Sequence, residues 1–489
     1  MKLTDLLDEL PSKTISGDPS GIDIKGLVYD PLRVNDGFLY VAINIYTQLD
    51  KIEIPDGHDV VEDAIKNGAA AVVLQKDMDV PDSVVKIVVP DSRYALALLA
   101  NKFYDYPSRD IRMIGITGTN GKTTTTHIVE SILGQKFRVG LIGTLYYKIN
   151  GKIFKSKDTT PEPPDLQEIF THMNNERVQY CAMEVSSHGI EFFRVHGVGY
   201  DAAVFTNLTQ DHLDFHKTIE NYRNTKLKLF GWLKDDDYAI INIDDPSASY
   251  FMEASRGKVL KYGIKNPADI SAKNIEMTIK GMKFTLVTPD GEIDVMPKLV
   301  GTFNIYNILA AVGVCWSEGL DLETIKKGLE ENIKVSGRFE LVDKGQDFSV
   351  VVDYAHTPDG IENVLKLAQD LKPNRVITVF GCGGDRDKEK RPIMGDIVSR
   401  FSDHFVITAD NPRNEEPQLI ANDIKKGIQH KDYKEIPDRY EAIQYAIKEA
   451  NPGDLVLLLG KGHETTQTLK HKTIHFNDVE VAEEILEAL

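Results

Sequence analysis

The sequence predicts an α/β protein of three domains, and three observations lead to this fold class. The chain has 489 residues, too many for one hydrophobic core. Short apolar runs alternate with helical patterns, as they do in parallel sheets. One apolar run leads through glycines into a helix, which is typical of a phosphate-binding loop, or P-loop. We expect a small N-terminal α/β domain (residues 1–107), a central P-loop domain with a doubly wound, mainly parallel sheet (108–337) and a C-terminal Rossmann-like domain (338–489).

The N-terminal domain is predicted to combine short strands with helices. A short amphipathic helix opens the chain, and apolar runs predict strands near 26–29 and 38–43. Residues 60–75 have the pattern of a helix followed by a strand, and residues 92–107 have that of a closing helix. The proline at position 107 then makes a boundary, because proline commonly follows the end of a helix.

The central domain is predicted from five apolar strands separated by helical segments. These strands are expected at 111–117, 139–143, 180–186, 202–208 and 238–243. Residues 269–299 alternate around two glycine-containing turns, which predicts an antiparallel appendage. A helix from Ile305 follows it.

The C-terminal domain repeats the pattern of short buried strands that run into loops and helices. Its strands are expected at 349–355, 375–381, 404–410 and 454–460. The polar segments HTPD, GCGGDRD, DNPR and GKGHE follow these strands. In such sheets ligands bind beyond the carboxyl ends of the strands, so we expect a binding site there.

The composition excludes several classes of function. Lys and Arg number 57 against 75 Asp and Glu, so the net charge is -18, which argues against general binding to nucleic acid or an anionic membrane. No apolar stretch approaches the roughly 18 residues that a bilayer requires. Three widely separated cysteines, Cys181, Cys315 and Cys382, indicate reduced thiols. We expect a cytoplasmic monomer that neither binds nucleic acid nor inserts into a membrane.

The P-loop is a variant of the general motif G-x-x-x-x-G-K-[ST], because Ile116 stands where that motif has its first glycine. Gly118 and Gly121 let the backbone approach a polyphosphate, and Lys122 reaches the terminal phosphates. The hydroxyl of Thr123 can ligate magnesium. The predicted nucleotide site comprises Gly118, Thr119, Asn120, Gly121, Lys122, Thr123 and Thr124.

Two further polar clusters follow strands of the same predicted sheet. In the first, Glu184 is suited to face magnesium held by Thr123, and Ser186 to meet a substrate oxygen. In the second, His212 is a candidate second metal ligand. The alternatives are a capped strand-to-helix turn for the first cluster and a hydrogen-bonded structural histidine for the second.

The motifs together resemble a known family. TGTNGKTTT, EVSSHG, TNLTQDHLDFH, GTFNIYN, GRFE, VVDYAHTPD, GCGGDRDKEKRP, DNPRNEEP and GKGHE occur in this order and resemble the motifs of the Mur ligases of peptidoglycan synthesis. The resemblance covers nearly the whole chain and is strongest from Gly115 to Glu464. The ordered set is far more specific than any one motif.

The resemblance implies an ATP-dependent ligase that uses Mg2+ and an acyl-phosphate intermediate. Its implied substrates are UDP-N-acetylmuramoyl-L-alanyl-D-glutamate, called the UDP-dipeptide below, and meso-2,6-diaminopimelate. Three alternatives remain open at this stage: a lysine-adding ligase of the same family, a ligase like folylpolyglutamate synthetase, and a catalytically silent, nucleotide-regulated binding protein. Arg413 argues against the first, and the N-terminal domain with the DNPR segment argues against the second.

The resemblance also assigns roles to residues of the central domain. The segment from 221 to 230 matches the one whose lysine is carbamylated in the family, and the alignment falls on Lys226. A carbamate beside magnesium replaces a repelled cation with an anionic ligand. The implied catalytic residues are Lys122, Lys226, His212 and Arg338, and the implied metal ligands are Thr123, Glu184, His212 and Lys226. The implied contacts to the UDP-dipeptide are Thr159, Thr160, Ser186 and Arg194, and those near adenine are Asn304 and Asn307.

The sequence departs from the family pattern at two places. Phe192 stands where a glutamine is common, two residues before Arg194, which removes a polar contact. Near the N-terminus, Asp30-Pro31-Leu32 replaces Asp-Ser-Arg, which removes a hydroxyl and a cation expected near the uridine nucleotide.

The choice of amino acid is expected to depend on Asp410, Asn411, Pro412 and Arg413. An Asn-Pro pair alone would indicate only a turn. Together with the other motifs, the segment resembles the family's diaminopimelate recognition motif. Arg413 can form a bidentate pair with the distal carboxylate of diaminopimelate, and the amino acid lysine has no such carboxylate. The remaining implied contacts to the amino acid are Arg386, Gly460 and Glu464.

Overall fold

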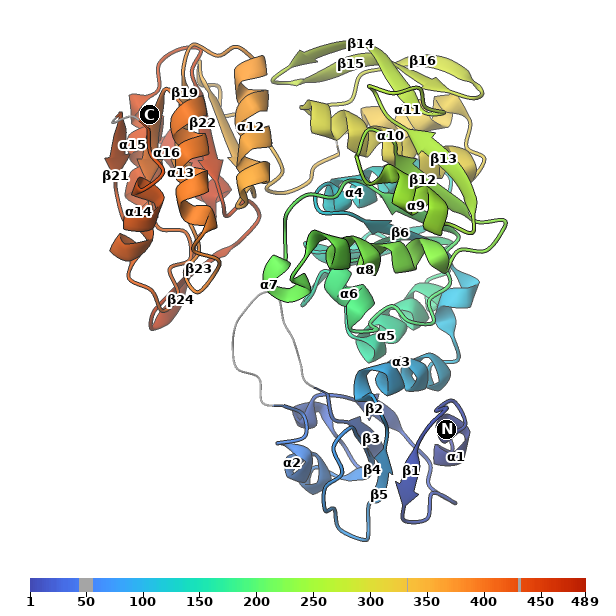
Figure 1. The fold of residues 1–489 in the computed structure, drawn as a ribbon. Coiled ribbons are helices and arrows are strands. Elements are labelled where there is room, and N and C mark those ends of the chain that lie inside the picture. The colour runs from blue at the N-terminus through green and yellow to red at the C-terminus, as the bar shows by residue number, and fades with distance from the viewer. Residues whose placement is uncertain (44–55, 332, 430–431) are drawn as a thin grey trace.

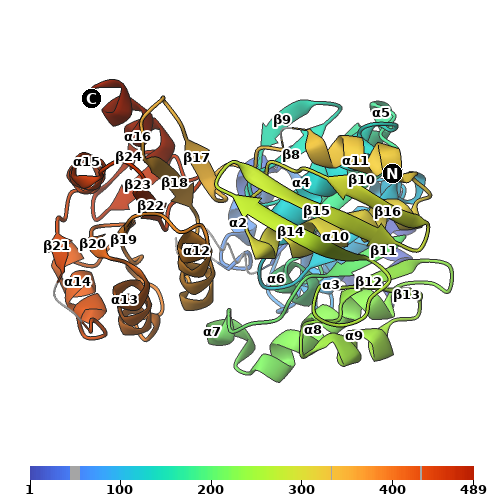
Figure 2. The same cartoon turned by 90° about the horizontal axis from the view of Figure 1, so that it is seen from above.

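The computed structural model describes residues 1–43, 56–331, 333–429 and 432–489, which form three α/β units and a small antiparallel sheet (Figure 1). The N-terminal unit lies at one end of the molecule and the central unit lies above it. The C-terminal unit stands beside the central one, as the view from above also shows (Figure 2). The predicted fold class is therefore confirmed.

The N-terminal unit is a five-stranded sheet in the order β1-β5-β4-β3-β2, in which only the pairing of β1 with β5 is antiparallel. The sequence missed β1, whose three residues are all exposed and carry no apolar pattern, and also β5. The elements are α1 (Leu3–Leu7), β1 (Thr14–Ser16), β2 (Gly26–Val28), the 3-10 helix η1 (Pro31–Arg33), β3 (Phe38–Val41), α2 (Val61–Lys66), β4 (Ala69–Leu74), β5 (Val85–Val88), α3 (Ser92–Phe103) and the 3-10 helix η2 (Pro107–Asp110).

The central unit contains an eight-stranded sheet in the order β13-β12-β11-β6-β10-β7-β8-β9. Neighbours from β13 to β7 are parallel, as predicted for this sheet, although β13 itself was not among the five predicted strands. The strands β8 and β9 add an antiparallel edge that was not predicted either. The strands are β6 (Arg112–Thr117), β7 (Val139–Ile142), β8 (Tyr146–Ile149), β9 (Lys152–Lys155), β10 (Tyr180–Glu184), β11 (Ala202–Phe205), β12 (Tyr238–Asn242) and β13 (Lys258–Tyr262).

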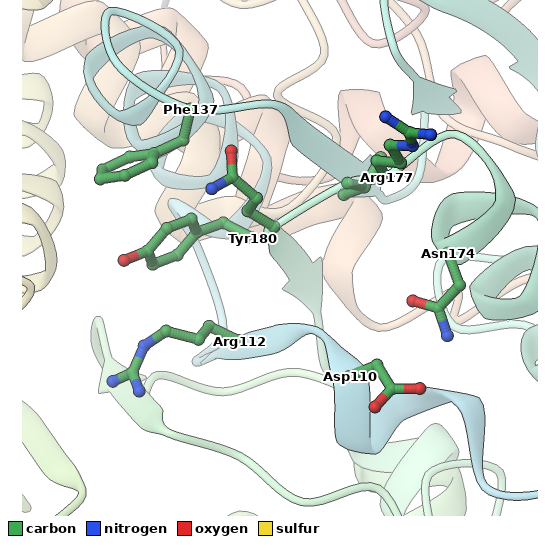
Figure 3. A pocket seen from close by; sticks show the side chains of 8 residues that line it. Asp110, Arg112, Phe137, Asn174, Arg177 and Tyr180 are labelled. Atoms are coloured by element: carbon green, nitrogen blue, oxygen red, sulfur yellow. The ribbon is translucent and has the colours of Figure 1, made fainter.

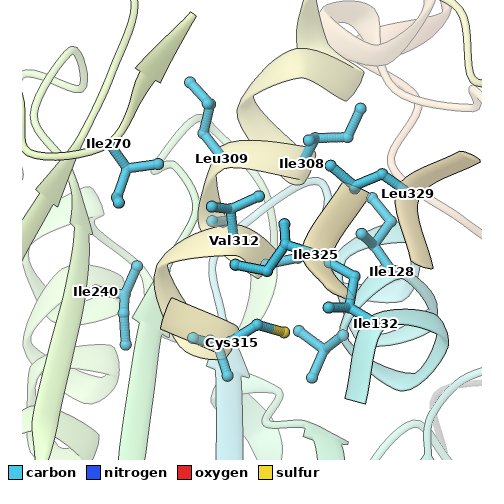
Figure 4. Close-up of a cluster of buried hydrophobic side chains, with 14 of the residues drawn as sticks. Ile128, Ile132, Ile240, Ile270, Ile308, Leu309, Val312, Cys315, Ile325 and Leu329 are labelled. Atoms are coloured by element: carbon cyan, nitrogen blue, oxygen red, sulfur yellow. The ribbon is translucent and has the colours of Figure 1, made fainter. Parts of the chain in front are cut away.

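Helices cover both faces of this sheet, which makes it doubly wound. On one face, Ile128 and Ile132 of α4 pack against Ile308 and Val312 of α10 and Ile325 of α11 (Figure 4). This core fixes the helix that begins at the P-loop. The helices are α4 (Lys122–Leu133), α5 (Pro163–Asn175), α6 (Ser187–Glu191), α7 (Leu213–His216), α8 (Ile219–Gly231), α9 (Ala248–Ala254), α10 (Thr302–Ser317) and α11 (Leu322–Glu330).

The predicted antiparallel appendage is confirmed as a three-stranded sheet of β14 (Ser271–Thr278), β15 (Gly281–Thr288) and β16 (Gly291–Val295). Its inward side chains, among them Met282, Phe284 and Leu286, join the same core as α10.

The C-terminal unit is a six-stranded sheet in the order β17-β18-β22-β19-β20-β21, parallel except for β17. The hairpin β23–β24 and the edge strands β17 and β21 were not predicted. The elements are β17 (Glu340–Val342), β18 (Ser349–Asp353), α12 (Pro358–Asp370), β19 (Val376–Phe380), α13 (Lys390–Phe401), β20 (His404–Ile407), α14 (Pro417–Lys425), β21 (Tyr433–Glu435), α15 (Arg439–Glu449), β22 (Leu455–Leu459), β23 (Thr466–Leu469), β24 (Lys472–His475) and α16 (Asp478–Glu487).

Polar contacts join the three units. Arg33 and Tyr29 of the N-terminal unit contact the carboxylate of Asp165 on α5, at 2.6 and 2.5 Å. On the other side, the amide of Asn120 in the P-loop donates to Asp359 on α12, at 2.9 Å. No helix in the described part of the chain is long and apolar enough to cross a membrane. The three cysteines are free and buried.

The C-terminal unit contains a fully buried ion pair that suggests a stability test. Arg439 on α15 donates to both carboxylate oxygens of Asp478 on α16, at 2.8 and 2.6 Å, and to the carbonyl of Leu459 on β22. We predict that Arg439→Met lowers the free energy of unfolding of this unit by about 3 to 5 kcal/mol, because it leaves a buried carboxylate without its partner. Peptide-resolved hydrogen exchange over β18, β19 and β22 measures the loss.

The matched control is Arg400→Met on α13. Arg400 pairs with Asp396 at 2.8 Å, but its side chain is 47% exposed. Its loss should change the free energy of unfolding by about 0.5 kcal/mol or less. Equal effects of the two substitutions would contradict the assigned importance of the buried pair.

Candidate active site

The glycine-rich loop connects β6 to α4 in a conformation that requires its glycines. Gly118 has a φ of +150° and Gly121 a φ of +90°, both in the region that favours glycine. A Cβ on Gly118 would collide with the hydroxyl of Thr206, and a Cβ on Gly121 with the amide oxygen of Asn307. The backbone therefore comes as close to its surroundings as a phosphate cradle requires.

The half-buried Lys122 and the fully buried Lys226 converge on one carbonyl oxygen of this loop. Lys122 donates to the carbonyls of Gly118 and Thr119, each at 2.9 Å, and Lys226 from α8 donates to Gly118 at 3.0 Å. Burial lowers the pKa of Lys122, and it lowers the pKa of Lys226 well below its usual value, with Lys122 adding to the effect. An anion bound here would therefore raise the pKa of both amines and stabilise their charged forms.

The middle of the loop is held by residues that follow β11. The side-chain oxygen of Asn207 accepts from the backbone N–H of Asn120 at 2.9 Å, and its carbonyl accepts from the N–H of Thr119 at 2.9 Å. The hydroxyl of Thr206 donates to the carbonyl of Asn120 at 2.7 Å. Thr124 is buried in the first turn of α4.

Glu184 lies at the end of β10, beside the start of α4, and is fully buried. Its carboxylate accepts from the hydroxyl of Thr123 at 3.0 Å, from the backbone N–H of Thr144 at 2.9 Å and from the hydroxyl of Thr144 at 3.1 Å. The predicted proximity of Thr123 and Glu184 is thus present. Thr144, which follows β7, was missed, although the rule that ligands gather at strand ends would have found it.

The donor set near Thr123 fits a magnesium ion. A hydroxyl and a carboxylate are the hard oxygen donors that Mg2+ prefers, together with phosphate oxygens and water. Within the described residues, no group of three His, Cys, Asp or Glu side chains could hold a metal ion. A metal at this place therefore needs the hydroxyl of Thr123, a phosphate or a modified lysine in addition to Glu184.

His212 lies in an aromatic cluster with His188 and Tyr222. Its ring is 4.9 Å from that of His188 and its Nε2 is 3.3 Å from the carboxylate of Asp211. Burial, followed by the neighbouring histidines, lowers the pKa of His188 to about 3. The role of His212 as a metal ligand stays a prediction.

The four predicted contacts to the UDP-dipeptide also lie together. The hydroxyl of Thr159 is 3.0 Å from that of Thr144. The hydroxyl of Thr160 donates to the carbonyl of Glu184 at 2.9 Å, and Arg194 donates to the carbonyl of Thr160 at 2.9 Å. Ser186 caps α6 by accepting from the N–H of Gly189 at 3.0 Å.

Arginines lie beside both departures from the family pattern. The guanidinium of Arg93 lies over the ring of Phe192, 4.4 Å from its centroid, and pairs with Glu162 at 3.2 Å. Arg194 pairs with the same carboxylate at 2.8 Å. Leu32 is 87% exposed, whereas the adjacent Arg33 contacts α5. The sequence interpretation missed Arg33 and Arg93 because both act across the junction of two units.

Residues at the start of α10 pack against the P-loop. Asn307 donates to Asn304 at 2.9 Å and accepts from Thr125 at 3.4 Å. These contacts orient Asn307 toward the loop backbone. Its proximity to adenine remains a prediction.

Arg338 lies at the junction with the C-terminal unit, above the ring of Tyr354 at 5.0 Å from its centroid. Burial lowers the pKa of Lys122, the carboxylates of Glu184 and Asp211 oppose that effect, and the charge of Arg338 adds to it. Nearby, Asp353 accepts from two backbone N–H groups at 2.7 Å, and burial lowers the pKa of His356. Arg338 is therefore within electrostatic range of Lys122 in the P-loop.

The predicted amino-acid residues form a second cluster at the strand ends of the C-terminal sheet. Arg413, with a φ of +51°, donates to the carbonyl of Gly384 at 2.9 Å. Asn411 donates to Glu464 at 2.7 Å. Gly460 leaves the carboxylate of Asp410 room, since a Cβ there would lie 2.6 Å from it. Arg386 lies two residues beyond Gly384, and Pro412 between Asn411 and Arg413.

Lys461 is the buried centre of this cluster and was not assigned a role from the sequence. Its ammonium donates to Glu464 at 2.8 Å, to Asn411 at 3.3 Å and to the carbonyl of Thr466 at 2.7 Å. It lies inside the GKGHE motif, so the signal was present. Full burial could not be deduced from one lysine between two glycines.

A surface hollow of about 550 Å³ lies elsewhere, at the amino ends of the central strands (Figure 3). Arg112 at the start of β6 and Tyr180 at the start of β10 line it, together with Phe137, Asn174 and Arg177. The P-loop follows the carboxyl end of β6, and Glu184 is the last residue of β10. The hollow is therefore separate from the candidate active site.

Comparison with known proteins adds sequence and structural relatives. The model described as Mur ligase middle domain matches residues 116–315, and that described as Mur ligase, glutamate ligase domain matches residues 337–462. Proteins named UDP-N-acetylmuramoyl-L-alanyl-D-glutamate--2,6-diaminopimelate ligase are 47% identical over 489 residues in Bacillus velezensis and 46% over 495 residues in Geobacillus thermodenitrificans, each alignment covering 99% of this chain and 98% of the relative. A solved structure of a ligase of that name is 32% identical, covers 99% of both chains and has a TM-score of 0.68.

The geometry of the P-loop predicts the effect of one added methyl group. Gly121→Ala should raise the Kd for ATP by about tenfold or more, because a side chain there strains the backbone and displaces Asn307. Isothermal titration calorimetry measures this. Gly199→Ala is the control, since a Cβ at Gly199 meets open space and should leave the Kd unchanged. Unchanged ATP affinity in Gly121→Ala would contradict the assignment of the loop.

Proposed function

The chain belongs to the Mur ligase family, and we propose that its two polar clusters are the two halves of one amide-forming active site. The protein is an ATP-dependent ligase that adds meso-2,6-diaminopimelate to the UDP-dipeptide, a step of peptidoglycan precursor synthesis. The observation that carries the residue assignment is the pairing of a lysine-lined P-loop on one sheet with a cluster around Arg413 on the next.

The reaction must first convert a carboxylate into an electrophile. An oxygen of the free side-chain carboxylate of D-glutamate attacks the terminal phosphorus of ATP, the bond to ADP breaks, and an acyl phosphate forms. The amine of diaminopimelate then attacks the acyl carbon, phosphate leaves, and the nitrogen loses a proton to give the amide. In both steps anions approach each other, so cations and N–H donors must hold them.

Lys122 and Arg338 supply positive charge to the phosphates in this proposal. Lys122 already faces the loop through the carbonyls of Gly118 and Thr119, and a polyphosphate would replace these acceptors with stronger ones. Magnesium would be held by Thr123 and Glu184, with His212 and carbamylated Lys226 as further ligands, and supplies charge neutralisation when bound.

The environment of Lys226 supports the proposed carbamylation. Burial, with Lys122 adding to the effect, lowers the pKa of Lys226 and so favours its neutral amine, which is the form that attacks carbon dioxide. A C–N bond forms, the nitrogen loses a proton, and an anionic carbamate results. This change replaces repulsion between Lys226 and Lys122 with attraction.

The UDP-dipeptide would lie against Thr159, Thr160, Ser186 and Arg194, between the central sheet and the N-terminal unit. The substrate amino acid would lie against Arg386, Asp410, Asn411, Pro412, Arg413, Gly460 and Glu464. Arg413 suits the distal carboxylate of diaminopimelate, and Glu464 suits an ammonium. Because one chain supplies both clusters, we propose a monomer, and the requirement for ATP together with three free, buried cysteines favours a cytoplasmic location.

Selection of the amino acid provides the test of this function. With ATP and the UDP-dipeptide, diaminopimelate should support ADP release and lysine should do so at least about tenfold less efficiently, because lysine leaves Arg413 without a carboxylate. Arg413→Ala should raise the KM for diaminopimelate selectively. Arg400→Ala, on the exposed face of α13, should change nothing. Equal turnover of lysine would favour the lysine-adding alternative and refute the specificity.

Carbamylation can be tested independently of turnover. After incubation with 13C-bicarbonate, carbon-13 NMR should detect one carbamate signal that is lost in Lys226→Ala and kept in Lys228→Ala. Both lysines lie on α8, but Lys228 is exposed and pairs with Glu191 at 2.8 Å. The kcat should fall only in the first variant, by about a hundredfold or more. A signal that survives in Lys226→Ala would disprove the assignment.

A further inference from the structure

Within the central cluster, Thr144 connects the proposed magnesium ligand Glu184 with the proposed UDP-dipeptide contact Thr159. It follows β7, beyond Gly143, and its hydroxyl lies 3.1 Å from the carboxylate of Glu184 and 3.0 Å from the hydroxyl of Thr159. Its backbone N–H also donates to Glu184, at 2.9 Å. One residue thus contacts both the carboxylate proposed to face magnesium and a threonine proposed to bind the UDP-dipeptide.

The hydrogen bonds of Thr144 can run in only one direction. An ionised carboxylate has no proton, so it only accepts, and a threonine hydroxyl has a single proton to donate. The proton of Thr144 therefore points to Glu184. The hydroxyl of Thr159 must then donate its own proton to Thr144. The Thr159 oxygen therefore has no proton left to donate and can only accept a further hydrogen bond.

The close approach of Glu184 to this turn requires a glycine at position 143. A Cβ on Gly143 would collide with the Oε1 atom of Glu184. The N–H of Thr144 and its hydroxyl bond different oxygens of the carboxylate, so together they fix its rotation. The hydroxyl of Thr123 then bonds the same oxygen as the hydroxyl of Thr144.

We propose that Thr144 is a positioning residue that orients Glu184 for the phosphate side of the reaction and makes Thr159 an acceptor for a peptide N–H of the substrate. This inference rests on the proposed function, because the UDP-dipeptide supplies the amide N–H groups. Thr159 accordingly discriminates in favour of an amide donor and against a carboxylate oxygen. Thr144 itself does not touch the reacting atoms.

The test uses binding by the full-length protein, measured by calorimetry. Thr144→Val removes the hydroxyl but keeps the backbone N–H and the side-chain shape. The Kd for the UDP-dipeptide should rise about tenfold, and the gain in ATP affinity that Mg2+ produces should fall about tenfold, as expected for the loss of hydrogen bonds to charged and polar partners. Thr144→Ser should restore both values to within about threefold.

Two further variants separate positioning from general damage. Thr171→Val on α5 removes a hydroxyl that donates only to the carbonyl of Gln167, and it should change neither Kd. In a Thr159→Val background, Thr144→Val should have no further effect on UDP-dipeptide affinity, because the chain of hydroxyls is already broken. Additive effects, or unchanged binding in Thr144→Val, would overturn the inference. A wild-type protein that binds both ligands without forming an amide would refute the proposed function instead, since these readouts need no turnover.

Discussion

The amines of Lys122 and Lys226 both donate to the carbonyl oxygen of Gly118, although burial disfavours two adjacent cations. This arrangement persists because the surrounding backbone is held by Asn207, Thr206 and the packed base of α4. An anion bound beside the two amines would therefore stabilise positive charge in the site. A polyphosphate on Lys122 and a carbamate on Lys226 would each provide such an anion. The net charge of -18 makes local cations the more necessary for binding a polyphosphate.

The fold places every other group of the site relative to that pair. Parallel strands β7, β6, β10 and β11 end at one edge of the sheet, so Thr144, the P-loop, Glu184 and Asn207 meet there, although long segments separate them in the sequence. The core of α4, α10 and α11 holds the P-loop helix rigidly (Figure 4). The orientation of these four groups relative to one another is consequently set by the packing of the sheet and its helices.

The sequence predicted most of the fold because its strands are buried, apolar and bounded by glycine or polar loops. It missed β1, β8 and β9, whose residues are mostly exposed or half-buried and show no continuous apolar run. The predicted site residues fall into two clusters, but partners that act across the chain were not visible. The sequence around Thr144, Arg93 and Lys461 did not mark them as site residues. Only their burial and hydrogen bonds in the structure distinguish them. One-dimensional patterns report periodicity, not which side chains converge.

The contact between Asn120 and Asp359 links the phosphate site to the placement of the C-terminal unit. Asn120 belongs to the P-loop, and Asp359 lies in the first turn of α12, which begins the unit that carries Arg413. Burial raises the pKa of Asp359. A polyphosphate in the loop would add negative charge next to this carboxylate and so weaken the contact, whereas Arg338 from the same junction would be drawn toward the phosphates. Through these opposite charges at one junction, occupancy of the loop would be coupled to the position of the amino-acid cluster.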